Sequence, residues 1–238
     1  MELGIIGGFG GFATLDFFGR LLSEFASETE RSYPHIVMDN NFSMPSRTKA
    51  LLTGEGYTEI VHALADSMRM MLREDVDFIV MVCGTAHAFL PDVYTIVPEA
   101  EPKVLHIIHL LGKEMQQERI RKVLVLAAEG VLRNGLYSGL LSGYGISCVE
   151  PEESAWGEIR NFIEMVKTNN YPQDAANRFV DFLGQYDAED VVLGCTELPV
   201  LLREISGRCP GLSTYRFRDP LDTVLKKLKH MSSEGEMR

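Results

Sequence analysis

Apolar runs and amphipathic stretches alternate along the whole chain, and this alternation predicts an α/β fold. The apolar runs have the length of strands and little polar alternation, which is typical of parallel strands buried on both faces. Between them, apolar residues recur every three or four positions, as on one face of a helix. Strands are predicted at 3–6, 35–38, 76–81, 103–108, 122–127, 145–149, 190–193 and 215–217. Helices are predicted at 15–25, 57–72, 132–141, 154–167, 172–186 and 220–230, and one more runs on to about 119.

Two segments of similar sequence follow two of the predicted strands. Val82-Cys83-Gly84-Thr85-Ala86-His87 follows the run 76–81, and Gly194-Cys195-Thr196-Glu197-Leu198-Pro199 follows the run 190–193. Open α/β sheets bind ligands outside the carboxyl ends of their strands, so both thiols are expected at such a crevice. A lone buried cysteine is more often a packed core residue. Two cysteines in matching places favour a reactive pair that faces one substrate.

The order of elements in the first half is repeated in the second. Each half offers strand, helix, strand, helix, strand, cysteine and short helix, followed by one more strand and helix at 103–119 and 214–230. This predicts two similar parallel-sheet α/β domains related by pseudo-two-fold symmetry, with the active site in the cleft between them. The expected domains are 1–98, completed by 210–230, and 99–209, followed by a mobile tail at 231–238.

A glycine-rich turn at 7–14 lies between the first strand and the first helix, where free N–H groups favour an anion. The spacing Gly8-x-Gly10-x-x-Ala13 also fits a dinucleotide-binding turn, with Asp39 as the acid that would bind the ribose. A non-catalytic nucleotide-binding module is therefore an alternative, and saturable binding of NADH would support it. This alternative leaves both cysteine segments without a role.

Composition narrows the partners of the chain. The 238 residues carry a net charge of −11, which argues against nucleic acid because a phosphate backbone requires a basic surface. No apolar run has the length of a membrane span. The four cysteines are few and widely spaced for a disulfide framework, and no signal peptide precedes the first strand. Reduced thiols in the cytoplasm are therefore expected.

Two thiols that face one carbon atom suit proton removal on one side and proton delivery on the other. A thiol pKa of ~8.5 can be lowered by helix N-termini and hydrogen-bond donors, which makes a thiolate accessible. Thr85 and Thr196 are expected to donate to a substrate carboxylate. Glu197 is expected to orient or deprotonate the second cysteine, and His87 the first, with a structural helix-face histidine as the alternative. A cysteine hydrolase, a zinc site or a P-loop would leave one or both segments unexplained.

At these residues the chain resembles the aspartate/glutamate racemase superfamily, and within it the aspartate racemase branch. The resemblance covers nearly the whole chain and implies a homodimer that uses neither pyridoxal phosphate nor a metal. It implies that Cys83 and Cys195 are the two acid/base residues. The motifs that carry it lie at 4–10 with 13–14, at 45–48, at 83–87, at 135–137 and at 193–199.

The resemblance also implies the substrate contacts. Arg47 matches an arginine that can bind an acidic side chain, Lys167 matches a second basic position, and Thr85 and Thr196 match residues near the substrate carboxylate. Gly8 and Phe9 lie in the glycine-rich turn, and Gly84 follows Cys83 directly. All three are expected beside the substrate.

The chain departs from the superfamily pattern at several positions. Gly84 replaces a usual asparagine, Phe9-Gly10-Gly11 replaces Met-Gly-Pro, and Ala128 and Val131 stand where threonines are common. The predicted function is a cofactor-independent racemase of aspartate or glutamate that acts at the α-carbon. The alternative within the same fold is an isomerase or decarboxylase of a small dicarboxylate, and the retained cysteine pair favours racemisation.

Overall fold

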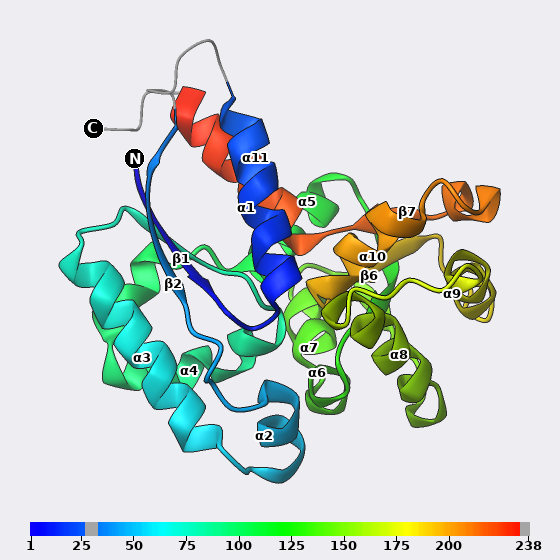
Figure 1. Cartoon of the computed structure of the whole chain (residues 1–238), viewed down its shortest axis with the longest axis horizontal. Helices are drawn as coiled ribbons and strands as arrows, with labels where there is room; N and C mark the ends of the chain where they lie inside the picture. Colours follow the sequence, from blue (N-terminus) through cyan, green and yellow to red (C-terminus); the bar gives the residue numbers. More distant parts are fainter. Residues whose placement is uncertain (27–32, 234–238) are drawn as a thin grey trace.

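The computed structural model describes residues 1–26 and 33–233, which form two parallel sheets flanked by helices (Figure 1). The first sheet has the strand order β2-β1-β3. Its strands are β1 (Glu2–Gly7), β2 (His35–Asn40) and β3 (Phe78–Met81). The second sheet has the order β5-β4-β6-β7. Its strands are β4 (Lys122–Leu126), β5 (Ser147–Val149), β6 (Asp190–Leu193) and β7 (Arg216–Arg218).

Helices join and cover the strands in both halves. In the first half they are α1 (Gly11–Phe25), α2 (Arg47–Thr53), α3 (Tyr57–Arg73) and α4 (Leu90–Ile96), with the 3₁₀ helices η2 (Thr85–Phe89) and η3 (Pro98–Lys103). In the second they are α5 (Ile107–Gln117), α6 (Glu129–Asn134), α7 (Leu136–Ser142), α8 (Trp156–Lys167), α9 (Ala175–Leu183), α10 (Glu197–Ile205) and α11 (Pro220–Ser233), with η4 (Glu153–Ala155) and η5 (Pro210–Thr214).

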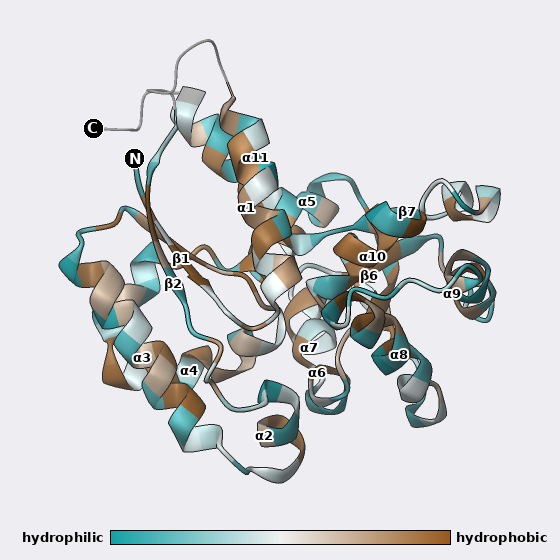
Figure 2. Cartoon of the chain, viewed as in Figure 1, coloured by the Kyte–Doolittle hydropathy of each residue, from teal (hydrophilic) through white to brown (hydrophobic). Residues whose placement is uncertain are grey.

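Of two buried apolar clusters among the described residues, one lies within the first half and the other extends through both halves and fixes their relative position. Leu3 and Ile5 of β1 belong to the same buried cluster as Leu124 of β4 and Val192 of β6. Helix α1 packs on α10 and α11, and α2 packs on α6, so the halves meet on both sides of the cleft. Figure 2 shows strongly apolar residues on the inner strands and mixed polarity on the outer helices. Close packing of this kind leaves little freedom for the groups between the halves.

The two halves repeat the same arrangement, as the sequence predicts. In each, the strand that precedes the cysteine lies beside the first strand of its half. The terminal helices of the two repeats, α5 and α11, pack on each other. None of the described helices is long and apolar enough to cross a membrane.

Four local predictions need correction. The strand expected at 103–108 is reduced to one bridge between Ile79 and Val104, because the proline-containing helix η3 occupies the residues before it. The helix expected at 132–141 is two helices, separated at Gly135, whose φ of 65° ends α6. Strand β7 pairs with β6 in the second sheet rather than completing the first domain, although α11 packs on α1. Helix α11 continues into the expected tail as far as Ser233, and residues 234–238 lie outside the described part.

Candidate active site

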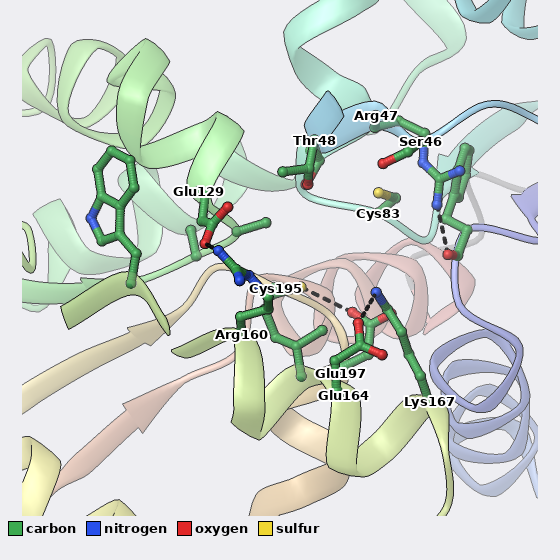
Figure 3. Close-up of a pocket in the computed structure, with 16 residues that line it drawn as sticks. Ser46, Arg47, Thr48, Cys83, Glu129, Arg160, Glu164, Lys167, Cys195 and Glu197 are labelled. Carbon is green, nitrogen blue, oxygen red and sulfur yellow. Dashed lines mark hydrogen bonds and ion pairs between the residues drawn. The ribbon is translucent and has the colours of Figure 1, made fainter. Parts of the chain in front are cut away.

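Cys83 and Cys195 line the same cavity, which has a volume of about 250 Å³ and lies between the two halves (Figure 3). This volume suits a small metabolite. The lining residues from the first half are Phe9, Ser46, Arg47, Thr48, Cys83 and Thr85. Those from the second half are Ala127, Ala128, Glu129, Trp156, Arg160, Ile163, Glu164, Lys167, Cys195 and Glu197.

Cys195 is hydrogen-bonded to a carboxylate. Its Sγ donates to Glu197 Oε2 over 3.0 Å, and the two side chains are only 8% and 5% exposed. Burial raises the pKa of Cys195 well above its ordinary value, and the negative charge of Glu197 adds to this rise. A thiol with a raised pKa keeps its proton at neutral pH, and the Glu197 carboxylate that accepts its hydrogen bond lies within reach of that proton.

The pKa of the Cys83 thiol is raised above its ordinary value, but several neighbouring groups act against this rise. Burial is the largest influence and raises its pKa, but the positive charge of Arg47 acts in the opposite direction. Glu197 raises the same pKa, while the N–H groups of Ala86 and Thr85 at the start of η2 lower it. These N–H groups are the hydrogen-bond donors that the start of a helix offers to an anion.

Arg47 is held firmly at the edge of the cavity by main-chain carbonyls. Its Nη2 donates to the carbonyl of Phe9 over 2.7 Å, and its Nη1 donates to those of Pro45 and Met44 over 2.9 and 3.3 Å. The guanidinium also lies over the Phe9 ring at 5.2 Å from the centroid. A planar fork held in this way is suited to a carboxylate ligand.

Helix α8 supplies a charged wall that the sequence analysis missed apart from Lys167. Lys167 Nζ lies 2.8 Å from Glu164 Oε1, and Arg160 forms an ion pair with Glu129 at the start of α6. Arg160, Ile163, Glu164 and Lys167 all line the cavity. Their spacing of three and four residues places them on one face of the helix, and this polar periodicity is the signal that could have identified them.

Several predicted contacts differ from those that the structure contains. The His87 ring does not serve the Cys83 thiol, because Nδ1 lies 2.8 Å from the Cys83 carbonyl and Nε2 accepts from the N–H of Ile107 at 3.5 Å. Burial lowers the pKa of His87 to about 4, so the ring is neutral. Unlike Thr85, which lines the cavity, neither Thr196 nor Gly84 is among its lining residues.

The glycine-rich turn faces the protein's own carboxylate. A Cβ atom at Gly10 would overlap Glu197 Oε1, so the glycine is what admits this side chain at the start of α1. Asp39, the residue expected to bind a ribose, accepts a hydrogen bond from Ser67 over 2.5 Å. Gly8 lines a second, adjoining cavity of about 480 Å³ together with Phe12. The occupied helix start argues against a bound pyrophosphate at this turn.

Two α/β halves that enclose a cavity lined by a pair of thiols indicate an enzyme whose active site lies in the cleft between them. A family model described as Asp/Glu/Hydantoin racemase matches residues 6–220, and the chain therefore belongs to this family and is an isomerase of the racemase type. It is 23% identical over 216 residues to the broad specificity amino-acid racemase RacX of Bacillus subtilis, which covers 87% of this chain and 90% of the relative.

Solved structures share the fold. The aspartate racemase of Picrophilus torridus superposes with a TM-score of 0.81 at 23% identity, covering 98% of this chain and 94% of the other. An aspartate racemase homologue from Pyrococcus horikoshii gives 0.74 at 23% identity, covering 98% and 99%. The predicted superfamily and two-domain fold are thus confirmed.

Proposed function

We propose that this protein interconverts the enantiomers of an acidic amino acid, aspartate or glutamate, through Cys83 and Cys195. The observation that carries the proposal is that the two thiols line one cavity from equivalent positions in opposite halves. Racemisation requires a base on one face of the α-carbon and an acid on the other. Two equivalent groups in a cavity between two similar halves meet that requirement.

The proton balance follows from the two environments. With Cys83 as thiolate, its sulfur takes the α-proton, and the Cys195 thiol gives its own proton to the opposite face. In the other direction, the reaction starts from the state that the first direction leaves, with Cys83 as thiol and Cys195 as thiolate, so that Cys195 is the base and Cys83 the acid. The free enzyme reaches this state when the Cys83 thiolate takes a proton from solvent and Cys195 passes its proton through Glu197 to solvent. The electrons of the broken C–H bond are held on the substrate carboxylate until the new C–H bond forms. The two thiols supply both proton transfers, so the proposal invokes neither a cofactor nor a metal.

Charge supports an acidic substrate. Arg47 retains donors beyond its three carbonyl contacts, and Lys167 adds a second cation on the opposite wall. Thr85 is the remaining predicted partner for the α-carboxylate. The named activities of the relatives, aspartate racemase and broad specificity amino-acid racemase, are compatible with this choice. We expect the protein to be a cytoplasmic homodimer. Analytical ultracentrifugation would measure the mass of the assembly.

The first test is incubation of the purified protein with a panel of acidic, neutral and basic amino acids in deuterated water, followed by mass and chiral analysis. We expect deuterium at the α-carbon and loss of chirality, fastest for aspartate or glutamate. A preference for neutral or basic amino acids would contradict the acidic assignment while leaving the two-thiol chemistry intact.

The second test separates the two thiols. Cys83→Ser and Cys195→Ser should each abolish racemisation, because each removes the acid or base on one face. A substrate analogue with a β leaving group needs only proton removal. We expect Cys83→Ser to eliminate from one enantiomer and Cys195→Ser from the opposite one. Cys148→Ser, at a half-buried cysteine outside the cavity, is the control. Retained racemisation in either active-site variant, or elimination from the same enantiomer in both, would contradict the mechanism.

A further inference from the structure

The two cysteine segments are held to their own halves in the same way. The N–H of Val82 donates to the carbonyl of Ile6 in β1 over 2.9 Å, and that of Gly194 donates to the carbonyl of Leu126 in β4 over 2.7 Å. Each bond anchors the residue immediately before a cysteine to a neighbouring strand. The carbonyl groups of Val82 and Gly194 are therefore equivalent, and both are contacted from outside their own segment.

On one side, the contact crosses directly between the segments. Thr196, which follows Cys195, is 5% exposed, and its hydroxyl donates to the carbonyl of Val82 over 3.5 Å. This bond links the residue after one cysteine to the residue before the other. It explains why Thr196 is turned away from the cavity that it was predicted to line.

On the other side, a different residue makes the equivalent contact. Gly84 is the counterpart of Thr196, and its backbone lies so close to Gly194 that a Cβ atom would overlap the Gly194 carbonyl oxygen. The Tyr137 hydroxyl donates to that carbonyl over 3.1 Å and lies 3.0 Å from the position a Gly84 Cβ would take. Tyr137 thus supplies the hydroxyl that Gly84 lacks.

We propose that Tyr137 and Thr196 are positioning residues, which together fix the separation of the Cys83 and Cys195 thiols through the carbonyls of Gly194 and Val82. Gly84 is the residue that allows the two segments to approach this closely. The catalytic part of this inference rests on the proposed function. The geometric part, that these hydroxyls set the spacing of the two thiols, does not.

The Tyr137 and Thr196 hydroxyls are buried, so the loss of either hydrogen bond is expected to disturb the structure. Tyr137 is completely buried, and burial raises its pKa well above 10, so its hydroxyl remains a donor at any working pH. Removing the hydroxyl leaves a buried carbonyl without a partner, which the segment can satisfy only by moving. A displacement of about 1 Å at a reacting group can cost on the order of 100-fold in rate.

The first experiment compares Tyr137→Phe and Thr196→Val with Tyr144→Phe and Thr223→Val. The controls remove hydroxyls that bond to His109 and to the Pro220 carbonyl, away from the cavity. We expect the two test variants to lose about 10- to 100-fold in kcat with KM changed less than about twofold, because spacing and not ground-state binding is altered. Thr196→Ser should restore most of the rate. A raised KM at unchanged kcat in Thr196→Val would overturn the positioning role.

The second experiment measures thiol spacing without turnover. Cys148→Ser with Cys209→Ser leaves only the two cavity cysteines, and a bifunctional alkylating reagent that fluoresces only when both ends react reports their proximity. We expect cross-linking to slow about 10-fold or more in Tyr137→Phe and Thr196→Val, while single alkylation by iodoacetamide and the melting temperature stay close to those of the controls. Slower cross-linking in a protein that racemises nothing would refute the proposed function and keep the positioning. Unchanged cross-linking, or none in the parent, would refute the positioning.

Discussion

Cys83 and Cys195 occupy equivalent places in the two halves, and burial raises the pKa of both thiols, but the largest charge influence is the Arg47 cation on Cys83 and the Glu197 anion on Cys195. Cys83 faces a fixed guanidinium and the N–H groups at the start of η2, which oppose the effect of burial on its pKa. Cys195 faces the Glu197 carboxylate, which adds to that effect. The difference shows how a repeated fold yields an asymmetric pair. One thiol is assisted as an anion, and the other holds its proton beside an acceptor.

The largest expected effect comes from Glu197→Gln, which removes the acceptor of the Cys195 proton. Burial, the main cause of the raised Cys195 pKa, persists in this variant, so the thiolate is not recovered. We expect racemisation to fall about 10²- to 10⁴-fold, the usual contribution of a proton-transfer group. In the elimination assay, the loss should fall on the enantiomer that Cys83→Ser still uses.

Glu164→Gln is the matched control for this prediction, because Glu164 lines the same cavity but bonds to Lys167. Elimination should be lost from one enantiomer in Glu197→Gln and from neither in the control. An equal loss from both enantiomers in Glu197→Gln would show that the carboxylate serves both thiols, and the contrast between the two halves would then disappear.

The second prediction concerns the stability that His87 provides. His87 anchors the Cys83 segment, whereas the equivalent position in the Cys195 segment is Pro199. The folded pKa of about 4 lies below the ordinary value of 6.5. The unfolded chain therefore binds the proton first as the pH falls, and the stability due to neutral His87 is complete above pH 6.5 and lost toward pH 4. The upper limit of this loss is about 3 kcal/mol.

Denaturant unfolding at several pH values between 4.5 and 7 would measure this loss. The His106 ring meets the His87 ring edge-on, and the His109 ring is tilted against His106; both have lowered pKa values too. The difference between the parent and His87→Gln therefore isolates one group. The variant should be less stable at pH 7 but lose less stability on acidification. His62→Gln, on the exposed face of α3, should keep the parent's pH dependence. A parallel pH dependence in His87→Gln would refute the prediction.

How much of the site could be predicted from the sequence depends on how far apart in the chain the interacting residues lie. The strand-end cysteines and the Cys195–Glu197 pair are local, and sequence order alone placed them. The contact between Gly84 and Gly194 joins residues far apart in the chain, and only the docking of two sheets creates it. The same docking turns Thr196 toward Val82 and brings Tyr137 into the gap.

The charged wall of α8 was missed for a different reason. Its helix was recognised by the apolar face that packs on the core. The polar periodicity groups Arg160, Glu164 and Lys167 on one face, but it does not by itself show that the opposite half closes over that face. The strand predicted at 103–108 shows the opposite kind of error, in which an expected element does not form. The apolar run fits the strand pattern, but the preceding proline-containing helix limits it to one bridge.

The smallest expected effect comes from Arg47, the cation on the Cys83 side of the comparison. Arg47→Ala removes the charge that lowers the Cys83 pKa, so the thiolate fraction at neutral pH should fall and alkylation of Cys83 should slow about 3- to 10-fold. The assay is mass-spectrometric labelling by iodoacetamide in the Cys195→Ser background across pH. Arg47→Lys should recover part of the rate, because charge returns without the fork that bonds to Phe9 and Pro45. Arg160→Ala, which removes a cation from the opposite wall, should change Cys83 labelling less than Arg47→Ala does. If the two alanine variants slow labelling equally, the assistance to Cys83 belongs to the net charge of the cavity and not to Arg47, and the two thiols differ only through Glu197.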